Sequence, residues 1–183
     1  MAGPTHELIE AKVLSSDDGG AGIEFTSIPQ TFTDLEIVFS LKYDAYSPTS
    51  ASYQRLDIRA NGSTTTTHYP YIYQGANQTS TGSRDSLFTE NAFQMTAAMA
   101  RADTRSASCG RIEIIDYTTT TVSSVQAWNS TLDYNASTGS NICHTKGHMN
   151  VGAAITSLKF TTYNSNTIAS GSYIRLYGIN RNI

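Results

Sequence analysis

Asp34-Leu-Glu-Ile-Val-Phe-Ser-Leu-Lys42 is the stretch of this sequence that decides the fold. Successive side chains of a β-strand point to opposite faces, so residues two apart share a face. One face receives the four apolar residues Leu35, Ile37, Phe39 and Leu41. The opposite face is polar except at Val38. This alternation predicts a half-buried strand whose apolar side lies against a hydrophobic core.

The same pattern recurs on both sides of this stretch. Short segments rich in apolar, β-branched or aromatic residues are separated by Gly, Pro, Asn, Asp and Ser, which favour turns. Asn61-Gly62 is a strong tight-turn signal between two such segments. We therefore predict an all-β protein, an antiparallel and jelly-roll-like β-sandwich. Strands are expected at residues 7–14, 22–27, 34–42, 54–60, 68–74, 108–117, 122–128, 142–152, 154–162 and 172–178.

The alternation also predicts which side chains form the core. Residues 1–7 are expected to be a flexible N-terminal arm, and residues 8–183 a single sandwich domain. The predicted core consists of large apolar residues on the shared faces of the strands: Ile23, Phe25, Leu35, Ile37, Phe39, Leu56, Ile58, Ile112, Ile114, Trp128, Ile155, Leu158, Phe160, Ile174 and Leu176.

Two segments depart from the simple strand pattern. Phe88, Ala92, Met95 and Met99 recur at helical spacing, so a short helix near residues 86–102 and a strand–loop–strand both fit. Pro70 lacks a backbone N–H, and a proline within a strand segment favours an edge strand for residues 68–74.

Composition and charge exclude several classes of protein. Charged residues are only 15% of the chain, and Ser, Thr and Asn together make up about a third. A net charge of −3 argues against a nucleic-acid partner, which requires a basic face. No apolar run is long enough to span a membrane, and Met1 to His6 lacks the features of a secretory signal, so we expect synthesis in a cytoplasm. In that compartment Cys109 and Cys143 are expected to be reduced, buried residues.

No motif predicts catalysis or a bound metal. Hydrolases place a nucleophile near a base, and the chain has no Gly-x-Ser-x-Gly elbow and no catalytic setting for its histidines. Cys143, His144 and His148 resemble metal ligands, but a zinc site normally needs a fourth group. We expect no enzyme activity, no metal and no cofactor. The acidic residues considered as candidates for sugar cleavage are dispersed along the chain: Asp57, Asp85, Glu90, Asp103, Glu113, Asp116 and Asp133.

A row of tyrosines carries the main hypothesis about binding. Tyr69, Tyr71 and Tyr73 are spaced two apart, which places their rings on one face of a strand. The rings could stack on the sugar rings of a host glycan, pack against a neighbouring subunit, where Tyr is enriched, or lie buried in the core. These three interpretations remain open at the level of sequence.

Three parts of the sequence resemble small bacteriophage structural proteins. They are the stretch from Phe25 to Phe39, Gly110-Arg-Ile-Glu-Ile-Ile-Asp-Tyr-Thr118, and Ile155-Thr-Ser-Leu-Lys-Phe160 with Gly171-Ser-Tyr-Ile-Arg-Leu-Tyr-Gly-Ile179. Similar segments occur in the same order in small virion proteins and in domains of fibre proteins, and the resemblance covers roughly residues 8–179. It implies a β-sandwich in a virion and no catalytic residue.

The resemblance leads to two expectations about function. The first is a capsid decoration (cement) protein at the capsid surface that stabilises the head by contacts with the major capsid protein or a neighbouring virion protein. A homotrimer is then expected, because closed rotational symmetry matches the three-fold points of a head lattice. The alternative is a receptor-binding module of the tail that recognises host surface glycans through loops.

Overall fold

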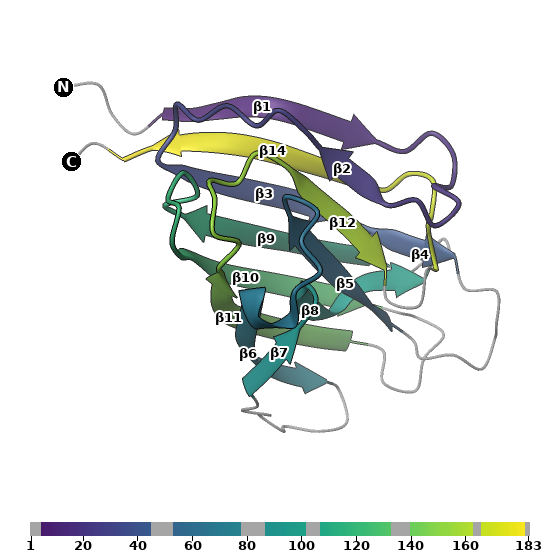
Figure 1. Cartoon of the computed structure of the whole chain (residues 1–183). Coiled ribbons are helices and arrows are strands. Elements are labelled where there is room, and N and C mark those ends of the chain that lie inside the picture. The colour runs from purple at the N-terminus through teal and green to yellow at the C-terminus, as the bar shows by residue number, and fades with distance from the viewer. Residues whose placement is uncertain are drawn as a thin grey trace.

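Two stacked β-sheets form the protein in this computed structural model, which describes residues 5–44, 53–77, 87–101, 107–132, 140–162 and 166–181. Figure 1 shows the larger sheet running from β1 at one end to β6 and β7 at the other. Its eight strands, in spatial order, are β1 (Thr5–Val13), β14 (Tyr173–Asn180), β3 (Asp34–Ser40), β9 (Ala107–Ile115), β10 (Ser123–Leu132), β11 (Ser140–Met149), β6 (Tyr69–Asn77) and β7 (Leu87–Glu90).

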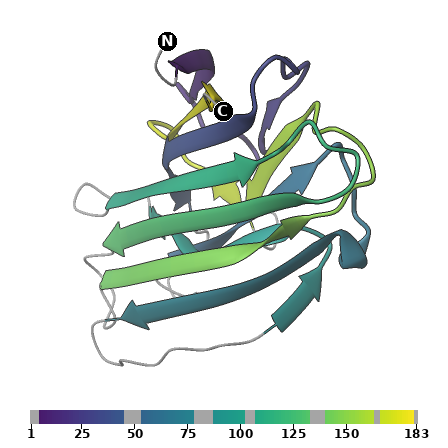
Figure 2. The ribbon, with the colours of Figure 1, turned by 90° about the vertical axis from the view of Figure 1, so that its left-hand side faces the viewer.

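The second sheet covers one face of the first (Figures 1 and 2). Its six strands, in spatial order, are β13 (Thr167–Ile168), β4 (Lys42–Asp44), β8 (Phe93–Arg101), β5 (Tyr53–Ala60), β12 (Leu158–Thr162) and β2 (Ile23–Phe25). Every strand pair of this sheet is antiparallel except β4 with β8, which is parallel. A 3-10 helix, η1 (Thr66–His68), precedes β6. In the described ranges no helix is long and apolar enough to span a membrane. The predicted fold, an all-β antiparallel sandwich, is confirmed.

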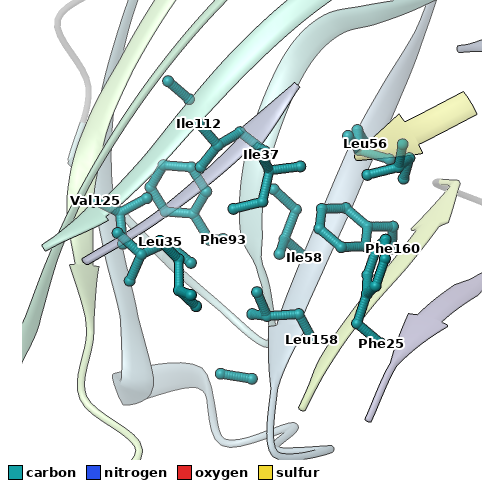
Figure 3. Packing of buried hydrophobic residues seen from close by; sticks show 14 of the residues in the cluster. Phe25, Leu35, Ile37, Leu56, Ile58, Phe93, Ile112, Val125, Leu158 and Phe160 are labelled. Atoms are coloured by element: carbon teal, nitrogen blue, oxygen red, sulfur yellow. The ribbon is translucent and has the colours of Figure 1, made fainter. Parts of the chain in front are cut away.

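The inner faces of the two sheets meet in one apolar cluster, shown in Figure 3. Leu35, Ile37 and Phe39 point inward from β3, as their alternation predicts. They meet residues such as Phe93 of β8 and Phe160 of β12 from the opposite sheet. Every residue of the predicted core is buried except one.

Trp128 is the exception, and its prediction as a core residue is wrong. On β10 the inward positions are taken by Val125, Ala127 and Asn129, so strand alternation turns Trp128 to the outer face. Its side chain is 37% exposed. Large apolar size alone favoured burial, whereas the register of β10 with β9 and β11 decides the face.

The helix considered near residues 86–102 does not form, because the segment is β7 and β8. Met95 pairs with Leu56 of β5, and on its other side β8 pairs with β4. Phe93 and Met95 are buried. Long-range pairing on both sides of β8 thus overrides the helical tendency of its Ala and Met residues.

The strand that contains Pro70 is not an edge strand, which corrects the prediction from sequence. β6 pairs with β11 on one side and with β7 on the other. The register with β11 runs from Tyr71 opposite Gly147 to Asn77 opposite Asn141, so it begins one residue after Pro70. The proline lies just beyond that ladder, where its missing N–H removes no bond to β11.

The other predicted boundaries are partly correct. Asn61 and Gly62 both have positive φ, at 51° and 66°. The N–H of Ser63 donates to the Ala60 carbonyl at 3.0 Å, so the predicted tight turn is present. It leads from one sheet to the other instead of closing a hairpin.

β1 begins at Thr5, so residues 5–7 are strand and not arm, while residues 1–4 lie outside the described part of the chain.

We expect truncation of a core phenylalanine to lower the free energy of unfolding. Phe160→Ala and Phe39→Ala each remove a fully buried ring. Each should cost about 3–5 kcal/mol, measured by urea denaturation. Val13→Ala is the control, because the Val13 side chain is 70% exposed. Its truncation should change stability by no more than about 0.5 kcal/mol. Wild-type stability in either phenylalanine variant would contradict the core assignment.

Candidate functional site

The tyrosine row is not a contact surface at two of its three positions. Tyr69 and Tyr71 are buried on the inner face of β6. The Tyr69 hydroxyl donates toward the carbonyls of Ala60 and Ser63, at 3.3 and 3.1 Å, and accepts the Ala60 N–H at 3.1 Å. The Tyr71 hydroxyl is hydrogen-bonded to Gln94. Of the three interpretations, burial holds for these two rings; the side chain of Tyr73 lies outside the described residues.

The cysteine and the two histidines of β11 do not lie together on one face of the strand. Cys143 points inward. His144 and His148 are one and five positions further along β11, so strand alternation places both on the opposite, outer face. In the described ranges no three His, Cys, Asp or Glu side chains converge as metal ligands. Burial raises the pKa of the Cys143 thiol to about 11, so the group stays protonated at neutral pH.

Cys109 is exposed, so the prediction that both cysteines are buried is wrong for this residue. The inner face of β9 is occupied by Ser108, Ile112 and Ile114, and alternation leaves Cys109 on the outer face. Both thiols are free.

Ion pairs that the sequence did not predict cross the outer face of the large sheet. The Arg111 guanidinium contacts the carboxylates of Glu36 and Glu113 at 2.9 and 2.6 Å, and His6 also contacts Glu36. Glu36 is buried although it lies on the outer face. A buried carboxylate needs such partners, because isolating a charge from water is costly.

A second network of the same kind closes the end of β9. Arg181 forms a two-contact ion pair with Asp34, from Nε to Oδ2 at 2.6 Å and from a terminal nitrogen to Oδ1 at 2.9 Å. It also contacts Asp116. The two networks tie β3, β9 and the end of β14 together. The carboxylates in them are paired with arginines.

Asp57 and Glu90 are the other acidic candidates in the described part of the chain. Asp57 lies on the smaller sheet, 2.9 Å from Arg55 Nε, and burial raises its pKa despite that cation. The charge of Glu90 adds to the rise in the pKa of Asp57. Asp85, Asp103 and Asp133 lie outside the described residues.

The outer face of β6, β11, β10 and β9 carries a different surface, which we call the outer patch; these strands lie in front in Figure 2. The register orders it into cross-strand rows. Pro70, His148, Ser124 and Ile115 belong to the first row, and Ile72, Lys146, Gln126 and Glu113 to the second. Gln74, His144, Trp128 and Arg111 form the third, followed by Ala76, Ile142, Ser130 and Cys109, with Leu132 beyond them.

One end of the outer patch is apolar. Trp128, Leu132 and Ile142 are exposed, and Ile142 is 68% exposed. Because Ile142 pairs with Ser130, it lies diagonally next to both Trp128 and Leu132. We call these three residues the apolar end.

The other end of the outer patch is hollowed. A depression of about 400 Å³ lies over the first two rows, with Pro70, Ile72 and Ile115 as apolar lining and Ser124, Gln126, Lys146 and His148 as polar lining. A second depression of about 380 Å³ adjoins it and shares Ile72 and Lys146, adding Gln74 and His144. Among the described residues, Lys146 is the single charged group lining these two depressions, histidines aside.

An aromatic pair joins the hollowed end to the apolar end. The rings of Trp128 and His144 are stacked, with centroids 5.0 Å apart and planes 10° from parallel. Burial, and to a lesser extent the nearby charge of Lys146, lowers the pKa of His144. The imidazole is therefore neutral at neutral pH, and its buried Nε2 has no hydrogen-bond partner within the described ranges.

Sequence reasoning missed the outer patch for a physical reason. Its residues come from four strands, of which β6 is distant in sequence from the other three, and they come together through the pairing of β6 with β11, of β11 with β10 and of β10 with β9. The available signal was the alternation of Ile142, His144, Lys146 and His148.

Comparisons with known proteins leave the function open. No family model and no curated protein matches the chain. Among solved structures, a peanut lectin with a nine-residue peptide is similar over 98% of this chain and 93% of that chain, with 8% identity and a TM-score of 0.27. A likeness this distant carries no argument about function.

We expect the two thiols to differ in reactivity with a disulfide reagent. Cys109 should react within minutes in the native protein, because it is exposed. Cys143 should react only after unfolding, because it is buried and its pKa is raised to about 11. The absorbance of the thiolate released from the reagent measures the reaction of each cysteine. Cys109→Ser should remove the fast phase, and a fast phase that persists in this variant would contradict the assignment.

Acidification should quench the emission of Trp128, the single tryptophan of the chain, as His144 becomes protonated against the indole ring. The midpoint should lie below pH 6.5, because the folded protein holds the pKa of His144 below its ordinary value. His144→Gln is the control and should abolish the transition. The same titration in that variant, or a midpoint above pH 6.5 in the wild type, would contradict the stacked neutral pair.

Proposed function

We propose that this chain is a structural protein of a bacteriophage virion, most directly a capsid decoration protein that acts by contact and without catalysis. The observation that carries the proposal is the apolar end of the outer patch. Exposed large apolar side chains that gather on one face of a rigid sheet mark an interaction surface. The resemblance of residues 8–179 to small virion proteins supplies the kind of particle.

The geometry supports contact in preference to chemistry. The carboxylates that come together on the outer face are held in ion pairs with Arg111 and Arg181. The apolar end, by contrast, consists of Trp128, Leu132 and Ile142 and is open to a partner. Its side chains project from paired strands, which fix their positions before binding and so reduce the entropic cost of association.

A decoration protein would act through mass action. Copies that bind only the assembled shell stabilise that state by their binding free energy. Binding through an apolar centre with polar neighbours such as Ser130 and Arg111 suits this task, because the polar rim stays hydrated before assembly. A homotrimer at the three-fold points of the lattice remains part of the proposal.

The second candidate is a receptor-binding module of the tail. The observation that favours it is the hollowed end of the outer patch, which offers hydrogen-bonding groups between apolar flanks. The two candidates differ in copy number, since a head lattice takes hundreds of copies and a tail takes a few to a few dozen.

The experiment adds purified protein to phage heads that lack it and counts bound copies by gel densitometry. Hundreds of copies per head are expected for the wild type. Ile142→Asp should reduce binding at least tenfold, because it places a charge in the centre of the apolar end. Val13→Asp introduces the same charge at an equally exposed position on β1, at the far end of the sheet, and should bind like the wild type.

Failure of the wild-type protein to bind heads would overturn the decoration role. Equal loss of binding in both aspartate variants would show that the apolar end is not the contact surface. Incorporation of only a few copies, confined to tails, would favour the second candidate.

A further inference from the structure

We propose that the hollowed end of the outer patch is a binding site for a saccharide that carries a carboxylate, such as a uronic acid. This goes beyond the contact role and does not depend on whether the chain is carried on the head or on the tail. The site combines unused hydrogen-bonding groups, apolar flanks and one positive charge.

Several polar groups of the depression have no partner among the described residues of the protein. Within the described ranges, Lys146 makes no ion pair, and the side chains of Ser124 and His148 make no hydrogen bond. All three belong to paired strands, so the backbone holds them in place. Saccharide hydroxyls both donate and accept hydrogen bonds, and a hydroxyl, an imidazole and an amine together meet both needs.

Gln126 is held in position by the ion pairs of the outer face. Its Nε2 donates to Glu113 Oε2 at 2.8 Å, and Arg111 holds the other oxygen of that carboxylate at 2.6 Å. This network assigns the amide orientation and leaves Oε1 as an acceptor without a partner in the described part of the chain. Fixing a binding group before the ligand arrives reduces the cost of binding.

The apolar lining of the depression fits the other side of a sugar. Pro70 and Ile72 of β6 on one side, and Ile115 of β9 on the other, supply aliphatic surface that flanks the polar side chains of β11 and β10. A pyranose ring has an apolar face of C–H groups and an equatorial rim of hydroxyls, so its C–H groups can contact these flanks while its hydroxyls reach the polar lining. The volume of the depression, about 400 Å³, lies in the range of small-molecule sites.

The charge of the site selects an acidic saccharide. Lys146 lies between the two depressions and lines both of them. No acidic side chain among the described residues neutralises Lys146. A ligand carboxylate would therefore form an ion pair with its ammonium group. A single lysine suits one carboxylate, whereas a nucleotide polyphosphate would require several cations or a phosphate-cradling loop. The adjoining depression provides room for a second sugar unit beside His144.

Trp128 makes the site measurable. It is the single tryptophan of the chain, two residues from Gln126 and stacked on His144, which lines the second depression. The probes are diuronic acids of galacto, gluco and manno configuration, each compared with the neutral disaccharide of the same stereochemistry and linkage. Binding is followed by Trp128 emission and by calorimetry at low salt, up to about 20 mM saccharide, which covers dissociation constants in the millimolar range.

At least one diuronic acid should shift the emission with saturation, and its neutral counterpart should bind at least tenfold more weakly. Lys146→Gln should weaken binding at least tenfold. Lys159→Gln is the matched control, because it removes the same charge from β12 of the opposite sheet, and it should bind within twofold of the wild type. Ser124→Leu fills the depression without a change of charge and should abolish binding, with folding checked by circular dichroism.

Three results would overturn the proposal. The first is the absence of saturable binding by every diuronic acid. The second is binding that Lys146→Gln and Ser124→Leu leave unchanged. The third is a concentration-dependent shift of Trp128 without saccharide that Ser124→Leu abolishes, since this would assign the hollowed end to a second copy of the chain. Loss of saccharide binding in Lys146→Gln with normal attachment to heads would separate this site from the proposed contact role.

Discussion

The burial of one face of each sheet against the other is the constraint on which the rest of the structure depends. Strand side chains alternate, so filling the inner face with residues such as Leu35, Ile37 and Phe39 dictates the outward direction of their neighbours. Close packing couples strands as well: a Cβ at Gly110 would lie 2.1 Å from the ring of Phe39. A change of register by one residue would therefore expose the core.

That constraint also explains the character of the outer face. Asp34 and Glu36 occupy outward positions of a central strand, where neighbouring strands bury them, and they are tolerated because Arg181 and Arg111 pair with them. These ion pairs secure the half of the sheet near β3 and β9. The described residues of the half near β6 and β11 form no comparable network, and they leave apolar groups and Lys146 open to a partner.

The local sequence pattern predicted the structure correctly wherever the alternating apolar residues are also the buried ones. The strand beginning at Asp34, the turn at Asn61-Gly62 and all but one member of the predicted core follow from it. It failed at Trp128, where ring size favoured burial but register decided exposure. At residues 87–101 it left a helix and a strand–loop–strand open, because Ala and Met recur at helical spacing, and pairing with β4 and β5 decided for the strands. Those partners of β8 lie far from it in sequence.

The amino-acid sequence by itself determined that this chain is all-β, that its strands have one apolar face and that its core is built from those faces, because a side-chain period of two is a local property. Only the tertiary structure decided which strands are neighbours. The surface formed by Ile72, Lys146 and Trp128 exists because β6, β11 and β10 pair in one register. Pairing between remote segments is a property of the whole chain, and no local pattern encodes it.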